Sequence, residues 1–502
     1  MTRGSRIAAA LLLAGIAGAA HAAEPANGYG PQVVGLTVTY QPWDQDRPWA
    51  RRAPQTRRAA AIVVEGPYLL TTAQIVSDAT FLQAEKNGRS PGTAARVVRT
   101  DPEIDLALVA VDDPAFFEGL RPAALASGSP AEGIVRTVRW KNRQLEVSEG
   151  RIARTEVQWS VFATVQHPFL LVASDLTAGG WSEPVFSGPA LVGLTASQDE
   201  RLARVIPVEI LATFLAQARS GETYRGFAAL GLSWQVNEDP VVARWLGLPG
   251  EPRGVLVTAV PYGGSGCGVI LPRDLLLSVG GLTVDGSGSV DHPRWGRQPF
   301  PFLAVDGRAP GDSLPVQVWR DGQLLDLSVT LRAADASLDL IPERRADGPP
   351  AYAVIGGLVF RELDGPYLRT WGEDWRKKAP VSLVTRFHVE SEEQSPERRR
   401  VLLLSRVLPH AYNLGYHTLS DLRVRRINGQ PIDAVSDVVD AFARPQGDVH
   451  RIELEPNPAQ AEVILDAATL EAADAEILEA YGIPQAVRPE SPRPDAGPAC
   501  GG

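Results

Sequence analysis

Cysteine and histidine are scarce in this chain. Its 502 residues include two cysteines, Cys267 and Cys500, and seven histidines scattered along the sequence. Two cysteines cannot build a disulfide framework, and no Cys/His spacing matches a zinc site. We therefore expect neither a metal nor a cofactor. Whether Cys267 and Cys500 pair in an oxidising compartment stays open on the sequence alone.

Long apolar runs are also missing. The apolar stretch 7–20 is shorter than the ~20 residues that a membrane-spanning helix needs, and no later segment approaches that length. Arg3 and Arg6 precede this stretch, and Ala20-His21-Ala22 offers a small-x-small cleavage site. The pattern predicts a signal peptide over residues 1–22 and export to the periplasm or the exterior, with an uncleaved anchor as the alternative.

The chain also lacks an excess of positive charge. The formal net charge is −10, and the one cluster of three arginines, 398–400, stands among glutamates. A surface of this sign repels polyanions, so nucleic acid is excluded as an expected partner.

The length and the pattern of short strands point to several domains. A chain of 502 residues exceeds a single hydrophobic core. Short β-rich runs such as 61–64, 106–111 and 170–172 favour a barrel or sandwich, and a helix is predicted over 207–219. Two alternating runs around Asp321-Gly322 predict a hairpin. We expect a β-rich domain over 30–220, a second domain over 224–334, a linker over 335–350, a third domain over 351–483 and a disordered tail over 484–502.

Three segments carry residues in an order that is typical of a known family. Residues 70–76 read LTTAQIV, residues 101–109 read DPEIDLALV, and residues 179–186 read GGWSEPVF. They resemble the general-base, acid and nucleophile elements of the HtrA/Deg (Do-like) serine proteases. The resemblance covers nearly all of the chain that follows the signal segment. It implies a mainly β fold, with a trypsin-like double β-barrel domain followed by two PDZ-like α+β domains.

The resemblance places the catalytic positions on residues that do not support hydrolysis. The base position holds Gln74, whose amide takes up no proton near neutral pH. The acid position retains Asp105, which can also serve as a turn residue before a buried strand. An ungapped count back from Pro184 puts Trp181 at the nucleophile position. Ser182 follows it and is the fallback nucleophile if a gap is inserted.

Two further residues bear on residual catalysis. Glu183 stands where the family has a glycine that lets backbone amides turn toward a developing oxyanion, so we do not expect an intact oxyanion hole. His167, the one histidine of the protease-like section, could replace the lost base only within hydrogen-bond reach of Ser182. For Trp181 we expect packing in or beside the vacated cleft.

Two segments resemble PDZ domains. Leu230, Gly231 and Leu232 match the loop that binds a terminal carboxylate through backbone amides. Residues 352–360, with the tryptophans at 371 and 375 and the stretch 424–429, resemble the second PDZ domain of plant-type Deg proteases.

The function expected from these features is that of an exported pseudoprotease. It would bind unfolded or C-terminal polypeptide segments through its PDZ modules, in a chaperone-like or scaffolding role in protein quality control. The resemblance also implies a homo-oligomer, as a trimer or multiples of it, or assembly with related proteases. Two alternatives remain: an active serine endopeptidase with a rearranged site, and a regulatory subunit of catalytic relatives.

Overall fold

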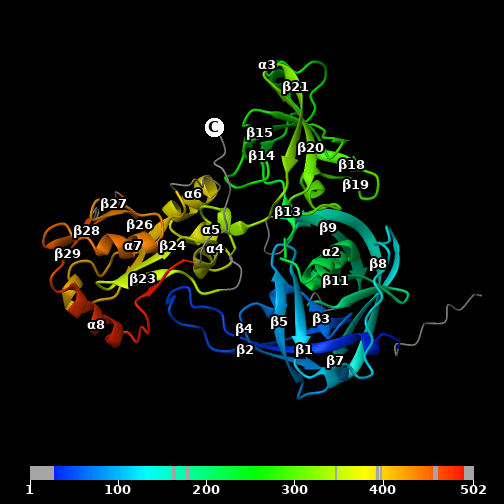
Figure 1. The fold of residues 1–502 in the computed structure, drawn as a ribbon, viewed down its shortest axis with the longest axis horizontal. Helices are drawn as coiled ribbons and strands as arrows, with labels where there is room; N and C mark the ends of the chain where they lie inside the picture. The colour runs from blue at the N-terminus through cyan, green and yellow to red at the C-terminus, as the bar shows by residue number, and fades with distance from the viewer. Residues whose placement is uncertain are drawn as a thin grey trace, which may run out of the picture.

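A computed structural model describes residues 28–160, 165–176, 181–344, 348–391, 395, 398–455 and 462–490. The expected signal peptide, the glycines at 179 and 180, and Cys500 lie outside these ranges. Three bodies follow one another along the chain (Figure 1): a pair of β-barrels, a second module above them and a third module to one side.

The first body consists of two closed six-stranded barrels, which confirms the expected double-barrel fold. The strand orders are β1-β2-β3-β6-β5-β4 and β10-β11-β12-β9-β8-β7. Alternating apolar residues fill each barrel, and the helix expected over 207–219 is α2 (Val208–Arg219). The elements of the first barrel are β1 (Val33–Tyr40), β2 (Gln55–Val64), β3 (Tyr68–Thr71), α1 (Ala73–Val76), β4 (Ala79–Glu85), β5 (Thr93–Asp101) and β6 (Leu106–Val111). Those of the second are β7 (Gly133–Lys141), β8 (Gln144–Trp159), β9 (Gln166–Ser174), β10 (Pro184–Ser187), β11 (Ala190–Asp199) and β12 (Leu202–Pro207).

The second body is a small α+β module whose main sheet runs β14-β15-β16-β20-β21. The predicted hairpin is present, because β20 pairs with β21 around Asp321 and Gly322, both at positive φ. The elements are β13 (Ala228–Ala229), β14 (Ser233–Gln235), α3 (Pro240–Trp245), β15 (Val255–Ala259), β16 (Leu275–Val279), β17 (Leu282–Thr283), β18 (Ser289–His292), β19 (Gly296–Pro299), the 3₁₀ helix η5 (Phe300–Ala304), β20 (Ser313–Arg320), β21 (Gln323–Thr330) and β22 (Arg332–Ala333).

The third body contains one sheet in the order β29-β28-β26-β25-β24-β23-β30, with β27 paired to β26. Helices α4 to α6 are inserted between β24 and β25. The elements are β23 (Tyr352–Ile355), β24 (Leu358–Glu362), α4 (Gly365–Leu368), α5 (Trp375–Lys378), α6 (Val381–Glu390), β25 (Leu402–Val407), β26 (Leu422–Ile427), β27 (Gln430–Pro431), α7 (Val435–Phe442), β28 (Val449–Leu454), β29 (Glu462–Asp466), α8 (Leu470–Ala480) and β30 (Val487–Arg488).

Two expected boundaries of the third body differ from the structure. Leu340 and Ile341, assigned to the linker, are fully buried in the cluster around Trp375. Residues 487–488, assigned to the disordered tail, form β30 on the edge of β23. Both segments are short and look polar in the sequence. Leu340 and Ile341 are buried by residues distant in sequence, and residues 487–488 form backbone hydrogen bonds with a distant strand.

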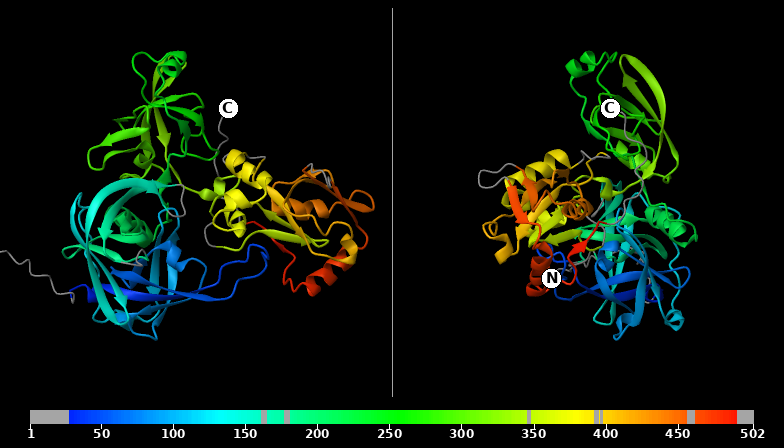
Figure 2. Two further views of the ribbon diagram at one scale, coloured as in Figure 1. Left: turned by 180° about the vertical axis from the view of Figure 1, so that it is seen from behind. Right: turned by 60° about the vertical axis from the view of Figure 1, so that its left-hand side comes forward.

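The connection between β1 and β2 reaches from the first barrel to the third body (Figure 2). We call residues 41–54 the arm. Arg361, 1% exposed, donates to the carbonyl and the side-chain oxygen of Gln45 and pairs with buried Asp364 at 3.3 Å. Arg488 donates to the carbonyl of Pro48 at 2.9 Å. The arm therefore joins the first barrel to the third body.

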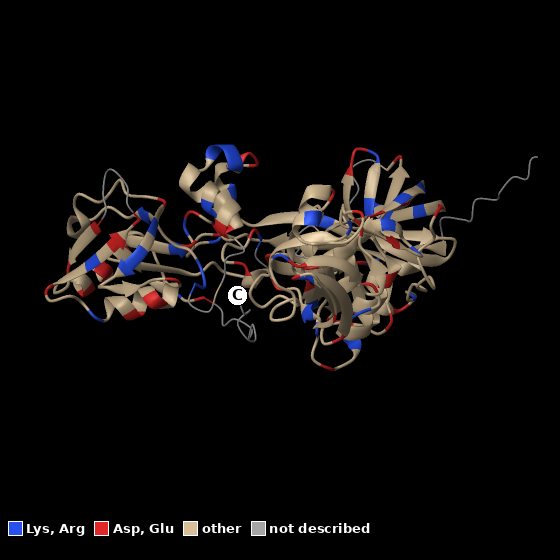
Figure 3. Ribbon diagram, turned by 90° about the horizontal axis from the view of Figure 1, so that it is seen from above, with Lys and Arg blue, Asp and Glu red and all other residues tan. Residues whose placement is uncertain are grey.

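Charged residues of both signs are interspersed over the three bodies (Figure 3). No helix in the described ranges has both the length and the apolar character to cross a membrane.

Candidate functional site

Gln74 occupies the position expected for a catalytic base, at the start of the short helix α1. Its side-chain Nε2 donates to Asp105 Oδ2 at 2.9 Å and to the carbonyl of Ala196 at 2.6 Å. Its backbone N–H donates to Asp105 Oδ1 at 2.8 Å. The amide thus makes the bond to the carboxylate that an imidazole N–H would make, but it has no basic nitrogen to offer a nucleophile.

Asp105 is buried directly before β6, at positive φ. Burial raises the pKa of Asp105 to about 7, against the opposing effect of the hydrogen bonds from Gln74. Because the carboxyl binds its proton more tightly in the folded chain than in the unfolded chain, folding is favoured most below the ordinary value of 3.8. This contribution is lost as the pH rises through about 7.

We predict a pH dependence of stability that Asp105→Asn removes. Between pH 5 and pH 8 the native chain should lose about 2–3 kcal/mol of unfolding free energy through this carboxyl. The variant, which cannot ionise here, should lack that part of the slope even if its absolute stability is lower. Urea unfolding of both proteins at several pH values measures the difference. Parallel curves would contradict the prediction. Asp101, whose pKa is also raised by burial, is present in both proteins and cancels.

Ser182 is not placed as a nucleophile. The residue is fully buried at φ +69°, and its Oγ accepts hydrogen bonds from the backbone N–H of Thr72 and the hydroxyl of Thr71, each at 3.0 Å. The Ser182 hydroxyl, just before β10 of the second barrel, therefore links that barrel to the end of β3 in the first. A serine held in this way has no exposed oxygen to attack a substrate.

Trp181 and Glu183 close the place where an oxyanion would be stabilised. The Glu183 carboxylate accepts a hydrogen bond from the backbone N–H of Trp181 at 2.8 Å, so this amide already serves an anion. Glu183 is 2% exposed and is further held by the hydroxyl of Thr195. The Trp181 side chain is 49% exposed. The sequence shows that Glu183 replaces a glycine, but it does not show that the Glu183 carboxylate accepts the hydrogen bond of the Trp181 amide.

His167 does not replace the base. Its ring is buried on β9 against Phe169, with ring centroids 4.2 Å apart, and Nδ1 bonds the neighbouring carbonyl of Pro168 at 2.9 Å. Burial lowers the pKa of His167 to about 4, which holds it neutral. No contact joins it to Ser182 within the described residues.

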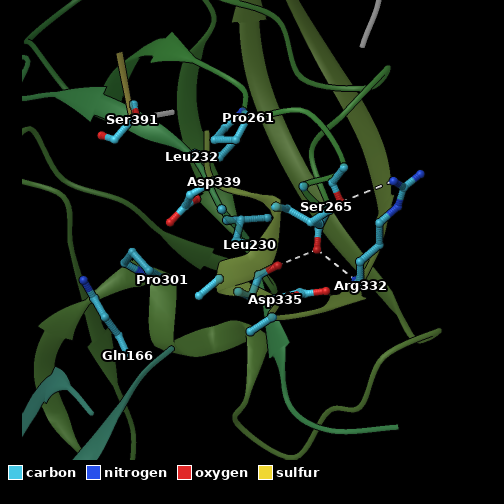
Figure 4. Close-up of a pocket in the computed structure, with 18 of the residues that line it drawn as sticks. Gln166, Leu230, Leu232, Pro261, Ser265, Pro301, Arg332, Asp335, Asp339 and Ser391 are labelled. Atoms are coloured by element: carbon cyan, nitrogen blue, oxygen red, sulfur yellow. Dashed lines mark hydrogen bonds between the residues drawn. The ribbon is translucent and has the colours of Figure 1, made fainter. Parts of the chain in front are cut away.

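A pocket of about 600 Å³ lies where the three bodies meet (Figure 4). Leu230, Gly231 and Leu232, the three residues expected to bind peptide, all line it. The lining also includes Asp339, which precedes the third body, and Ser391, which follows α6. In the described part of the chain, the backbone N–H groups of Gly231 and Leu232 meet no acceptor. Two adjacent unpaired amides in a turn suit a carboxylate.

The equivalent place in the third body is filled by the chain itself. The turn Gly356-Gly357 joins β23 to β24, and β23 lies along the edge of β24 to which a peptide would add. The amide of Gly356 already donates to the Asp474 carboxylate at 2.6 Å. β30 then covers β23. The third body therefore has neither a free edge at β24 nor a free amide at Gly356, which the sequence alone did not reveal.

No group of three or more potential metal ligands is gathered in the residues that the structure places.

The PDZ domain family model matches residues 341–490. Two relatives from Arabidopsis thaliana are "Protease Do-like 2, chloroplastic", 25% identical over 90% of this chain and 74% of its own length, and "Protease Do-like 4, mitochondrial", 22% identical over 88% and 81%. Among solved structures, the HtrA-type protease AlgW with a decapeptide is 21% identical, with a TM-score of 0.46, over 62% of this chain and 99% of its own.

Proposed function

The chain is a member of the HtrA/Deg family, and from that premise we propose that it binds polypeptide ends without cleaving them. The observation that carries the first half of the proposal is the pair of unpaired amides at Gly231 and Leu232 in the pocket. The observation that carries the second half is the Gln74 amide, bonded to Asp105 where a base is required. Together these observations support our proposal of a pseudoprotease with one usable peptide module.

The lost catalytic groups reinforce one another. A hydroxyl becomes nucleophilic only when a base can take its proton, and Gln74 offers none. Ser182, the serine next to the expected nucleophile position, has its oxygen bonded to Thr71 and Thr72. An acyl-transfer step would further need donors for an oxyanion, and the Trp181 amide is already bonded to Glu183.

The biological setting that we propose follows the sequence. The predicted signal segment would deliver the protein to the periplasm or the exterior, where it would hold unfolded or C-terminal polypeptide segments in a chaperone-like or scaffolding role. Assembly into a homo-oligomer, or with catalytic relatives, would multiply the number of peptide pockets and raise avidity.

We predict that the first PDZ pocket binds peptides through their free carboxylate. Gly231→Val should weaken binding of such peptides about tenfold or more, because Gly231 has φ +59° and a β-branched residue there costs at least ~1–2 kcal/mol or forces the amides out of line. Fluorescence polarisation with a library of short labelled peptides, each as a free acid and as an amide, gives the affinities.

The matched control is Gly247→Val in the same module. Gly247 has a similar φ of +69° but open space around it, and it is not among the residues that line the pocket. Equal affinities for free acids and amides, or equal losses in the two variants, would contradict the proposal.

A further inference from the structure

The third body and the connection that leads to it contribute to the pocket of the first PDZ module. The last turn of α6 lines this pocket, and so does the 3₁₀ helix η6 (Ala336–Leu338) of the connection. Figure 4 shows Ser391, just after α6, around the same pocket as Leu230 and Leu232. We give the name outer wall to the following lining residues: Ala336, Leu338, Phe387, His388 and Ser391.

Hydrogen bonds hold the outer wall in place between the two modules. On one side, the connection begins directly after β22, which pairs with β13 of the first module. On the other side, the N–H of Leu340 donates to the carbonyl of Ser391 at 2.7 Å. Arg400, 6% exposed, donates to the carbonyls of Ser337 and Asp339 at 2.6 and 2.7 Å. The outer wall is therefore a fixed part of the pocket.

The side chains of the outer wall can bury an apolar group. Phe387 packs edge-on against Trp375, with ring centroids 5.1 Å apart, and the exposed ring of His388 lies parallel to the same indole. Leu338 is half-buried beside them in the lining. A ligand side chain placed here would cover aromatic and aliphatic surface, which favours an apolar residue.

An extended ligand would present side chains to two sides of the pocket. In the usual PDZ mode a peptide adds as a strand to a sheet edge, and β14 is the edge strand here. Alternate side chains of a strand point to opposite faces. If the last side chain faces Leu232, Trp234 and Phe300 of the first module, the penultimate side chain faces the other way, toward the outer wall.

We propose that the outer wall determines specificity, so that the pocket selects polypeptide ends with apolar residues at consecutive positions. A one-sided groove reads every second residue of a bound strand, whereas this pocket contacts both of its faces. Consecutive apolar residues are typical of strands that are buried on both faces in folded proteins, so the ligands are tails of unfolded chains. This inference rests on the proposed peptide-binding function, and it gives the third body a role in the site of another module.

Fluorescence polarisation with labelled free-acid peptides tests the selection. The peptides end in leucine and carry either leucine or serine at the penultimate position. The full chain should bind the leucine peptide about tenfold more tightly, the factor expected when roughly half of a leucine side chain is buried. His388→Asp should reduce the difference to about twofold or less, because it places a charge on the outer wall. Free acids should still bind this variant better than amides.

The matched control is Val389→Asp, which introduces the same charge in the same helical turn. Val389 is 64% exposed and is not among the residues that line the pocket. This variant should keep the preference for penultimate leucine. Equal affinities of the leucine and serine peptides for the unmodified chain would overturn the inference, and so would an equal loss of preference in the two variants.

Photo-cross-linking locates the ligand side chains directly. A diazirine analogue of leucine at the penultimate position should label residues 336–341 or 387–391 of the full chain. The same group on the last residue should label residues 230–234 or 300–301. Mass spectrometry of the digested protein identifies the labelled segments. Labelling of the first module alone from both positions would contradict the role of the outer wall.

The outcomes separate the two proposals. If free acids bind better than amides but show no preference at the penultimate position, the outer wall has no role while the peptide pocket stands. If no peptide with a free carboxylate binds, the proposed function fails and the inference about the outer wall fails with it.

Discussion

The purified protein should leave a fluorophosphonate probe unreacted and unfolded casein intact. Loss of a catalytic serine or histidine alone lowers turnover by on the order of a million-fold in serine proteases. Here the amide of Gln74 stands at the position of the base and takes up no proton, and the oxygen of Ser182 is bonded to Thr71 and Thr72. Probe labelling that disappears in Ser182→Ala would show instead an active endopeptidase with a rearranged site.

The combined variant Gln74→His, Trp181→Ser and Glu183→Gly should become reactive toward the same probe. Histidine would take over the bond from Gln74 to Asp105, serine would supply a hydroxyl at the ungapped nucleophile position, and glycine would free the amide of residue 181. One oxyanion donor raises the rate about 10²–10³-fold. The double variant Gln74→His, Trp181→Ser, which keeps Glu183, should therefore label about 10²–10³-fold more slowly than the triple variant. Adding Asp105→Asn to the triple variant should abolish the gain.

Removal of Arg361 should release the arm from the third body. Arg361 is 1% exposed, pairs with the fully buried Asp364, and lies over the ring of Tyr367 with its guanidinium carbon 4.1 Å from the centroid. Breaking a buried ion pair by removing one partner costs about 3–5 kcal/mol, because the other charge is left without compensation. Arg361→Ala should therefore destabilise the third body and expose the arm.

Limited trypsin digestion measures this release, since Arg47, Arg51 and Arg52 lie in the arm. Cleavage there should be about tenfold faster or more in Arg361→Ala, as expected when local opening becomes easier. Arg406→Met is the matched control, because its ion pair with Asp46 is 3.0 Å long but exposed, and such pairs contribute ~0–1 kcal/mol. Equal cleavage in both variants would contradict the role given to Arg361.

The parts of the fold that depend on short-range pattern were predictable. Short β-rich runs predicted the barrel strands, the helical spacing predicted α2, and two alternating runs around Asp321-Gly322 predicted the β20–β21 hairpin. The loss of the base could be read from one position, Gln74. In each case the signal lies within a few neighbouring residues.

The parts that depend on contacts between distant residues were not predictable. The positive φ of Ser182 lets the Glu183 carboxylate fold back onto the Trp181 amide, and no local pattern announces that geometry. The filling of the second PDZ module by β23, β30 and Asp474 requires strand pairing and a helix position that only the whole module defines. The boundaries at 340 and 487 failed for the same reason.

The position of β30 also affects the order of events during synthesis. Tyr352 pairs with Arg488, and its hydroxyl donates to the carbonyl of Gln485, 133 residues later in the chain. The edge of β23 thus stays uncovered until residues 485–488 have been made, whereas the barrels that precede it can close on residues already present. During synthesis the third module can therefore complete its sheet only after the barrels, and its open edge is exposed to wrong pairing in that interval.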